Sequence, residues 1–353
     1  MHSNDERPSR APLPQTGSPF STTSGAGPAQ APAPEAPSGP AAPHPRRGGP
    51  RPVPPGVEYH RVLAGDKPRI GRGILAITLL VVGMFAFGIA IAAAAAFVDS
   101  LMGRTNPTFG GTDYTPLFHA ANLFSIALLI PWSMFLQRWL YGVKGASLHS
   151  VLSSFRFDLL GRALLFMGPL WLAVSIAMFA LKPQEQVPWS PVSLLSLFAL
   201  TLVLTPLQGA GEEYGYRGLV FRVAGSWSRG PRTALVVSVL VSSLVFAVVH
   251  LSGDLWHNVL FFVIGASMAL ITWRTGGIEV SIVWHALNNT LSFLIYILLH
   301  ADLNAALERS AGTGTITLAI PCVALVVITA VVWWRTRKTG PALTPSGPQP
   351  THS

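Results

Sequence analysis

Charged residues and cysteine are scarce in this chain of 353 residues. Lys, Arg, Asp and Glu together make up 11% of the sequence, whereas a soluble globular domain carries about 25%. Apolar residues make up 50%. This composition excludes a soluble protein and predicts an all-α fold, a polytopic bundle of transmembrane helices. Cys322 is the only cysteine, which excludes an internal disulfide and a thiolate metal cluster.

The formal net charge of +9 does not indicate a nucleic-acid partner. The basic residues lie between apolar runs rather than in a cluster or stripe, and such charges typically set the orientation of transmembrane helices. The polar segments between successive apolar runs lie alternately on the two sides of the membrane. The segments on one side carry 16 Lys and Arg residues, and those on the other side carry 3, namely Arg104, Lys182 and Arg309. This asymmetry predicts a multi-pass protein of the cell membrane with both termini in the cytoplasm.

The first 58 residues are rich in Pro, Ala and Gly. The first 55 residues contain 15 of the 30 prolines, and Phe20 is the only aromatic residue before Tyr59. Such a segment buries too little apolar area to offset its conformational entropy, so residues 1–58 are predicted to be a disordered cytoplasmic tail. It lacks the apolar central stretch of a signal peptide. A docking segment for proline-binding modules is the alternative.

Eight apolar runs follow this tail. A transmembrane helix needs about 20 apolar residues to cross about 30 Å of hydrocarbon. The predicted transmembrane bundle covers residues 71–336, and residues 337–353 are predicted to be a short cytoplasmic tail. The eight predicted spans are 74–97, 117–136, 159–181, 194–207, 234–251, 255–273, 278–299 and 316–334.

Ionisable or strongly polar side chains interrupt the apolar pattern at four places. A charged side chain at membrane depth costs about 2.5–3.5 kcal/mol, so such residues usually mark a functional site. The four places are residues 211–218, residues 246–250, residues 285–289, and the pair Asp254 and His257.

The stretch 211–218 directly continues the fourth apolar run. On a helix, Glu213 and Arg217 are four residues apart on one face, in the order that favours an ion pair. Glu212 points about 100° away from Glu213 and has no obvious partner, which suits a general base. The alternative is that both glutamates lie in a solvated link at the end of the span.

His285 and Asn289 share one face of the seventh span. An imidazole and an amide on one ridge offer two donors toward a common point, which suits an oxyanion; alternatively, His285 is a metal ligand that Asn289 supports. The structural alternative is an interhelical hydrogen bond. His250, at the end of the fifth span, would by itself favour contact with water or headgroups.

Three motifs occur in order on successive spans. They are Glu-Glu-x-x-x-Arg from Glu212, Phe-x-x-x-His from Phe246, and His-x-x-x-Asn from His285. Together they resemble the CPBP family, the CAAX-processing and bacteriocin-processing intramembrane proteases that include the type II CAAX prenyl endopeptidase. The resemblance covers about residues 190–300. Tyr216 stands where the family more often has Phe.

The resemblance implies a role for each matched residue. Glu212 is similar to the catalytic glutamate of the family, and His250 to its water-activating partner. His285 and Asn289 resemble the pair that stabilises the tetrahedral intermediate. The residues that resemble structural supports are Glu213, Arg217 and Phe246.

Two mechanisms are compatible with such a site, one that uses a metal cofactor and one that does not. Members of the family are often described as metalloproteases, and Glu212, His250 and His285 would form a three-ligand site for Zn²⁺ or another divalent metal. The alternative is metal-free activation of water by Glu212 and His250. The sequence has no His-Glu-x-x-His motif. Glu212 cannot be a metal ligand and a free base at once, so the two mechanisms exclude each other.

The resulting expectation is an intramembrane endopeptidase that hydrolyses peptide bonds of membrane-associated peptides or proteins within the lipid bilayer. Its chemistry requires Glu212 and His250 to meet. A helical rise of 1.5 Å per residue instead places Glu212 near the inner end of the fourth span and His250 about 20 Å away in depth. The site therefore requires Glu212 to lie deeper than hydropathy indicates, or the fifth span to start late.

Two other functions are compatible with the polar cluster. A non-catalytic membrane scaffold, or a bacteriocin-immunity-type protein, would use the cluster for helix packing or partner binding. A proton-coupled transporter is disfavoured, because the first and second four spans show no inverted repeat.

Overall fold

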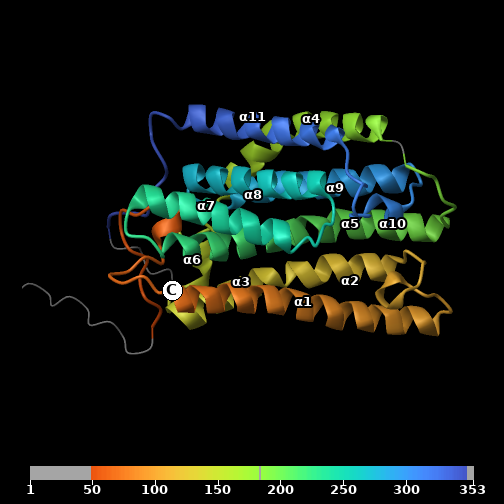
Figure 1. The fold of residues 1–353 in the computed structure, drawn as a ribbon, viewed down its shortest axis with the longest axis horizontal. Helices are drawn as coiled ribbons and strands as arrows, with labels where there is room; N and C mark the ends of the chain where they lie inside the picture. Colours follow the sequence, from red (N-terminus) through yellow and green to blue (C-terminus); the bar gives the residue numbers. More distant parts are fainter. Residues whose placement is uncertain (1–48, 183, 348–353) are drawn as a thin grey trace, which may run out of the picture. The chain divides into compact units, whose positions relative to one another are not determined.

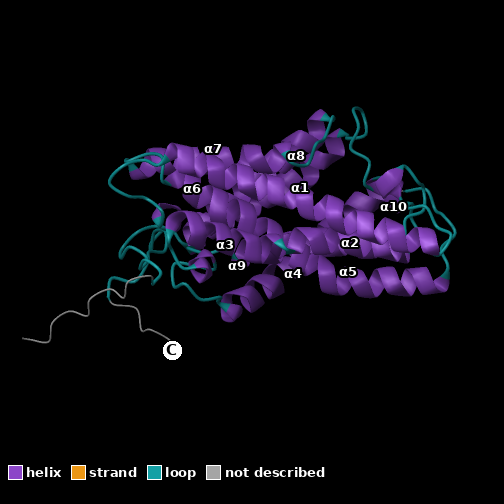
Figure 2. Ribbon diagram, turned by 90° about the horizontal axis from the view of Figure 1, so that it is seen from below, coloured by secondary structure: helices purple, strands orange, loops and turns teal. Residues whose placement is uncertain are grey.

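The structure, a computed structural model, describes residues 49–182 and 184–347 as a helical bundle (Figures 1 and 2). Most of the predicted tail, residues 1–48, lies outside the described residues. The described ranges contain isolated β-bridges but no strand, which confirms the all-α prediction. The α-helices are α1 (Ile70–Leu101), α2 (Pro116–Ala127), α3 (Leu129–Tyr141), α4 (Phe157–Leu181), α5 (Pro191–Glu212), α6 (Phe221–Gly225), α7 (Pro231–Val248), α8 (Leu255–Thr275), α9 (Glu279–Leu298), α10 (Leu303–Ala306) and α11 (Ala319–Arg335).

Eight helical segments of the described chain are long and apolar enough to cross a membrane, as the sequence predicts. The second span consists of α2 and α3. The fourth consists of α5, a π-helix at Glu213–Val220, and α6. The other six spans differ from their predicted ranges only at their ends. The hydropathy pattern therefore predicts the number and order of the spans.

The fourth span is much longer than its apolar run predicts. It continues from Pro191 to Gly225 over 35 residues, about 52 Å at 1.5 Å per residue, whereas the apolar run ends at Leu207. Its polar second half stays helical because other parts of the protein surround it, and residues 208–225 are buried throughout. This burial contradicts the alternative in which Glu212 and Glu213 lie in a solvated link.

Two glycines let neighbouring helices approach the fourth span closely. A Cβ atom on Gly211 would lie 2.2 Å from the carbonyl oxygen of Ile126 in α2, and one on Gly209 would lie 3.2 Å from the amide nitrogen of Ala286 in α9. Small residues at helix contacts permit such packing in membranes. As a result α5 lies directly against both α2 and α9 (Figure 1).

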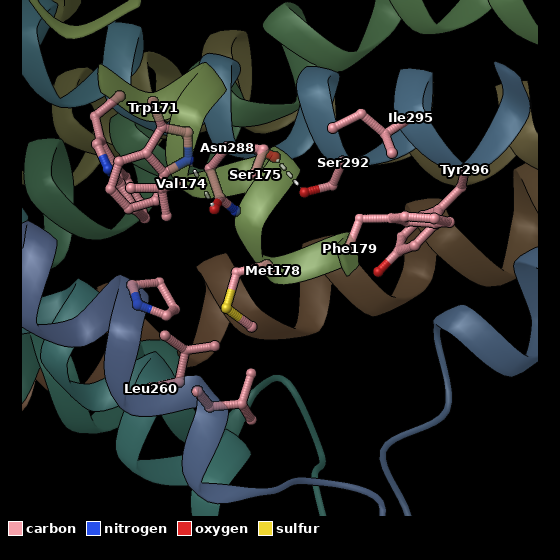
Figure 3. A pocket seen from close by; sticks show the side chains of 13 residues that line it. Trp171, Val174, Ser175, Met178, Phe179, Leu260, Asn288, Ser292, Ile295 and Tyr296 are labelled. Carbon is pink, nitrogen blue, oxygen red and sulfur yellow. Dashed lines mark hydrogen bonds between the residues drawn. The ribbon is translucent and has the colours of Figure 1, made fainter. Parts of the chain in front are cut away.

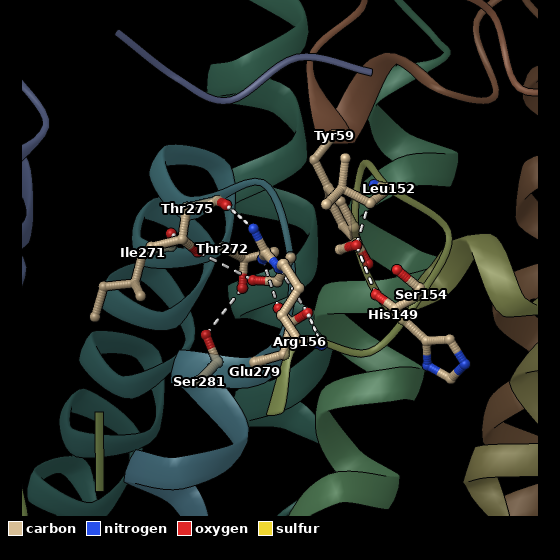
Figure 4. A network of polar contacts seen from close by, with 12 residues as sticks. Tyr59, His149, Leu152, Ser154, Arg156, Ile271, Thr272, Thr275, Glu279 and Ser281 are labelled. Atoms are coloured by element: carbon tan, nitrogen blue, oxygen red, sulfur yellow. Dashed lines mark hydrogen bonds and ion pairs between the residues drawn. The ribbon is translucent and has the colours of Figure 1, made fainter. Parts of the chain in front are cut away.

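An ion pair fixes the first turn of α9 (Figure 4). The guanidinium of Arg156 binds both carboxylate oxygens of Glu279, at 2.8 Å from Nε and 2.6 Å from Nη2. Nη1 of Arg156 donates to the carbonyl of Thr275, the last residue of α8, at 2.9 Å. The hydroxyls of Thr272 and Ser281 lie 2.9 Å apart beside this pair. These contacts hold the start of α9 against α8, and α9 then carries His285 within its first half.

Residues at both ends of the described chain pack onto the bundle. The amide of Arg51 donates to the carbonyl of Gly142 at 2.8 Å. The amide of Val57 donates to Oγ1 of Thr344 at 3.0 Å, and the amide of Thr344 donates to the carbonyl of Val57 at 2.9 Å. Residues 51–57 of the predicted N-terminal tail and Thr344 of the predicted C-terminal tail are thus held to the rest of the chain by backbone hydrogen bonds. The spans themselves begin at Ile70 and end at Arg335.

Candidate active site

Glu212 and Glu213 bring two carboxylates to one histidine ring. Glu212 ends α5 and Glu213 begins the π-helix, so their side chains leave the helix axis about 100° apart. His285 of α9 lies between them. Its Nε2 is 3.2 Å from Oε2 of Glu212, and its Nδ1 is 2.8 Å from Oε1 of Glu213. All three side chains are buried, so α5 and α9 share one polar cluster inside the bundle.

The predicted ion pair between Glu213 and Arg217 is present. Nη1 of Arg217 lies 3.1 Å from Oε1 of Glu213, and both side chains are fully buried. The guanidinium lies over the ring of Phe246 in α7, 4.1 Å from the ring centroid. A cation over an aromatic face is attracted by the ring quadrupole. Phe246, the first residue of the Phe-x-x-x-His motif, therefore helps to position the guanidinium of Arg217 beside Glu213.

Gln208 is a member of the cluster that the motifs do not include. Its Nε2 donates to Oε1 of Glu212 at 2.7 Å, and its Oε1 accepts from Nδ2 of Asn289 at 2.9 Å. Glu212 therefore has a hydrogen-bond partner, whereas the sequence predicted that it has none. Asn289 is thereby linked to Glu212 through Gln208. The spacing of four residues between Gln208 and Glu212 could have predicted this contact, because such residues are neighbours on a helix.

The chain of amide contacts continues from Asn289 to α4. Nδ2 of Asn288 donates to Oδ1 of Asn289 at 2.8 Å. The indole N–H of Trp171 donates to Oδ1 of Asn288 at 3.3 Å (Figure 3). Each of the three amides therefore accepts one hydrogen bond and donates one. The chain runs from Trp171 across α9 and α5 to the carboxylate of Glu212.

His250 lies just beyond the end of α7, with one ring nitrogen engaged. Its Nδ1 is 2.6 Å from the carbonyl oxygen of Phe246, so Nδ1 carries the proton and Nε2 is left as an acceptor. The ring stacks on Phe261 of α8, with centroids 3.9 Å apart. Burial lowers the pKa of His250 to about 4, against the opposing effect of the Glu212 carboxylate. The imidazole is consequently neutral at neutral pH.

The length of the fourth span removes the expected conflict of depth between Glu212 and His250. Because that helix continues to Gly225, Glu212 lies about 20 Å from its end rather than at its end. The ring of Phe246 is 4.6 Å from the ring of His250 and 6.0 Å from the ring of His285. Both histidines therefore lie beside the same phenylalanine. No hydrogen bond joins His250 directly to Glu212 in the described part of the chain.

Comparison with known proteins agrees with the motifs. Residues 191–291 match the family described as type II CAAX prenyl endopeptidase Rce1-like. This matched stretch, called the Rce1-like segment for its similarity to that family, makes up less than a third of the chain. The match confirms the resemblance to the CPBP family, whose members are CAAX-type intramembrane proteases, and it includes Glu212, His250, His285 and Asn289.

A curated relative covers part of the same chain. "Uncharacterized protein YyaK" of Bacillus subtilis (strain 168) is 28% identical over 128 residues, which are 34% of this chain. The matched region spans 42% of the length of that relative. No solved structure matches the chain.

The donor atoms of the Rce1-like segment do not form the expected three-ligand metal site. Both ring nitrogens of His285 contact carboxylates, and Nδ1 of His250 contacts a backbone carbonyl. Among the described residues, no three His, Cys, Asp or Glu side chains are grouped so that they could hold a metal ion. The set Glu212, His250 and His285 therefore does not fit a metal in this arrangement.

Asp254 and His257, the fourth polar stretch, form a helix cap. Oδ1 of Asp254 accepts the amide of His257 at 3.0 Å, as an N-cap residue of α8 does. Oδ2 of Asp254 accepts the amide of Gly312 at 3.1 Å. The pair thus joins the start of α8 to the loop before the eighth span, and these contacts are structural.

Proposed function

We propose that this protein is an intramembrane endopeptidase that hydrolyses peptide bonds of membrane-associated peptides or proteins. The observation that carries the proposal is the bridge of His285 between Glu212 and Glu213, with neutral His250 beside it. Apolar residues of similar volume would pack as well as buried ions, so a cluster of charges inside a membrane bundle favours a function. The Rce1-like match of residues 191–291 supports the same reaction class.

Glu212 and His250 activate water in the proposed mechanism. A water molecule held between the Glu212 carboxylate and Nε2 of His250 attacks the carbonyl carbon of the peptide bond. As the C–O bond forms, one water proton passes to Glu212 and the carbonyl electron pair moves to oxygen. The tetrahedral intermediate then collapses with cleavage of the C–N bond. The leaving amine nitrogen takes the proton from Glu212.

Asn289 and His285 stabilise the oxyanion of this intermediate. Gln208 takes one of the two N–H groups of the Asn289 amide, so the second remains available. The contact of His285 with Glu212, at 3.2 Å, is longer than its contact with Glu213, at 2.8 Å. When Glu212 takes the water proton it loses its charge and holds Nε2–H less strongly. The donor is thereby released as the oxyanion forms.

The location of the protein is part of the proposal. We place it in the cell membrane with both termini in the cytoplasm. Arg217 and Arg222, which contribute to the more basic set of polar segments, are buried inside the fourth span and carry no topological information. The remaining basic residues keep the same asymmetry and support this orientation.

The decisive experiment is Glu212→Gln in the full-length protein, assayed for cleavage of a membrane-anchored peptide. Removing a general base lowers kcat by about 10²–10⁴-fold. Glutamine keeps an oxygen that accepts from Gln208, so we expect an unchanged melting temperature. Glu308→Gln, which changes an exposed carboxylate in a loop, is the matched control and should keep full activity.

Two results separate the alternatives. Full activity of Glu212→Gln would exclude the mechanism. Absence of cleavage by the unmodified protein, together with loss of folding in Glu212→Gln, would favour the non-catalytic scaffold or immunity-type protein.

A further inference from the structure

A cavity lies beside the polar cluster, between α4, α8, α9 and the start of the eighth span (Figure 3). Its volume is about 190 Å³. Pockets for drug-sized ligands are larger, about 300–1,000 Å³, so this cavity suits a side chain rather than a cofactor. Val174, Phe179 and Leu260 give it apolar walls, and Asn288 and Ser292 form a polar strip along α9.

Two residues of the cavity wall contact the proposed active site. The ring centroid of Trp284 lies 6.1 Å from that of His285. Asn288 belongs to the amide chain that reaches Glu212 through Asn289 and Gln208. A group held in the cavity therefore lies one side chain away from the imidazole of His285, and three amide side chains link the cavity to the carboxylate of Glu212.

The polar strip of the cavity can also bind a ligand. Asn288 uses one of its two amide N–H groups on Asn289, so the second remains available. A ligand that brings an oxygen acceptor together with apolar surface would match both the polar strip and the apolar walls. A peptide carbonyl next to an apolar side chain has this chemistry.

We infer that the cavity is the subsite for an apolar side chain of the substrate peptide, with the adjacent peptide carbonyl lying along the polar strip of Asn288 and Ser292. The inference rests on the proposed endopeptidase function and specifies its substrate. Val174 and Phe179 are only half-buried on a membrane-spanning helix, so a peptide segment within the bilayer can reach the cavity from the side. The subsite thus selects apolar residues next to the cleaved bond.

The test uses membrane-anchored peptides that carry Ala, Leu or Phe at each position near the cleavage site. The unmodified protein should prefer Leu over Ala at one position by about tenfold or more in kcat/KM, as a hydrophobic pocket discriminates. Val174→Phe fills the cavity and should remove this preference by slowing the Leu peptide while leaving the Ala peptide unchanged. Phe179→Ala enlarges the cavity and should shift the preference toward Phe.

Ala266→Phe is the matched control. Ala266 lines a separate cavity between α8 and α11, also among membrane-spanning helices, and has no link to the amide chain. This variant should keep the preference for Leu. An unchanged preference in both Val174→Phe and Phe179→Ala, or an equal loss for all peptides, would overturn the subsite. Absence of cleavage by the unmodified protein would instead refute the proposed function itself.

Discussion

His285 joins Glu212 and Glu213, with one carboxylate at each nitrogen of its ring. Nδ1 is hydrogen-bonded to Glu213 at 2.8 Å, whereas Nε2 lies 3.2 Å from Glu212. Arg217 adds a cation 3.1 Å from the same oxygen of Glu213. Each of the two carboxylates therefore has a nitrogen partner inside the bundle, which offsets part of the cost of burying it.

Removal of Arg217 should destabilise the protein strongly. Arg217→Met leaves Glu213 short of one positive partner, and breaking a buried ion pair costs about 3–5 kcal/mol. We expect a large fall in melting temperature in detergent. Arg162→Met is the control, because it breaks an exposed pair with Asp158 at the same spacing, 2.5 Å long, and exposed pairs contribute little. Equal melting temperatures for the two variants would show that the buried pair of Arg217 and Glu213 contributes no more to stability than an exposed pair.

Gln208 should affect turnover more than binding. Gln208→Leu removes the donor that orients Glu212 and the acceptor that orients Asn289. Misplacement of a catalytic group by about 1 Å can lower the rate about 10²-fold, so kcat should fall while KM changes little. Gln137→Leu serves as the control, since Gln137 is also buried and hydrogen-bonded, but to Lys144 and Ser147. A loss of kcat of the same size in both variants would show that Gln208 is only structural.

His250 should be required for catalysis, whereas His257 should not. His250→Ala removes the Nε2 that accepts a hydrogen bond from the attacking water and orients it toward Glu212, and kcat should fall by about 10²–10⁴-fold. His257→Ala changes the neighbouring histidine that contacts Asp254, and it should keep most of the activity. The reverse order of activities would exclude His250 as the partner of Glu212.

The pH dependence should reflect the neutral ring of His250. Burial lowers its pKa to about 4, so the ring can accept a proton throughout the neutral range. The activity of the unmodified protein should therefore persist as the pH falls below 6.5 and should decline only toward pH 4. Measurement of kcat/KM between pH 4 and pH 8 tests this. Loss of activity centred near pH 6.5, the ordinary pKa of histidine, would contradict it.

Chelation should leave the peptidase active. Both ring nitrogens of His285 contact carboxylates, and among the described residues Glu212, His250 and His285 are not grouped as a three-ligand set. Protein dialysed against EDTA should cleave the membrane peptide at the original rate. Loss of activity that Zn²⁺ restores would support the metal-dependent mechanism instead.

Local spacing predicted the contacts within one helix but not those between helices. Glu213 and Arg217 are four residues apart, so helical geometry alone brings them together. The bridge by His285 depends on how α9 packs against α5, through the approach of Ala286 to Gly209. Hydrophobic spacing contains no information on this packing. The link from Asn289 to Glu212 was missed for the same reason, because Gln208 belongs to another helix than Asn289.

Hydropathy predicted eight spans but ended the fourth too early. The method assumes that a polar residue lies outside the lipid, and residues 208–217 are rich in polar groups. In the structure these residues are surrounded by protein, so the assumption does not hold there. Glu279 was overlooked similarly: it is fully buried, but its partner Arg156 lies more than a hundred residues earlier in the chain.

The long fourth span has a consequence for biogenesis. During synthesis, 72 residues separate Glu213 from His285, so the acidic pair emerges well before the imidazole that joins it to α9. Until then the second half of this helix has no shielding from α9 and cannot enter lipid without an energetic penalty. A nascent chain released before α9 is complete would expose this segment to chaperones and quality-control proteases. Insertion of the fourth span is therefore completed only when the seventh arrives.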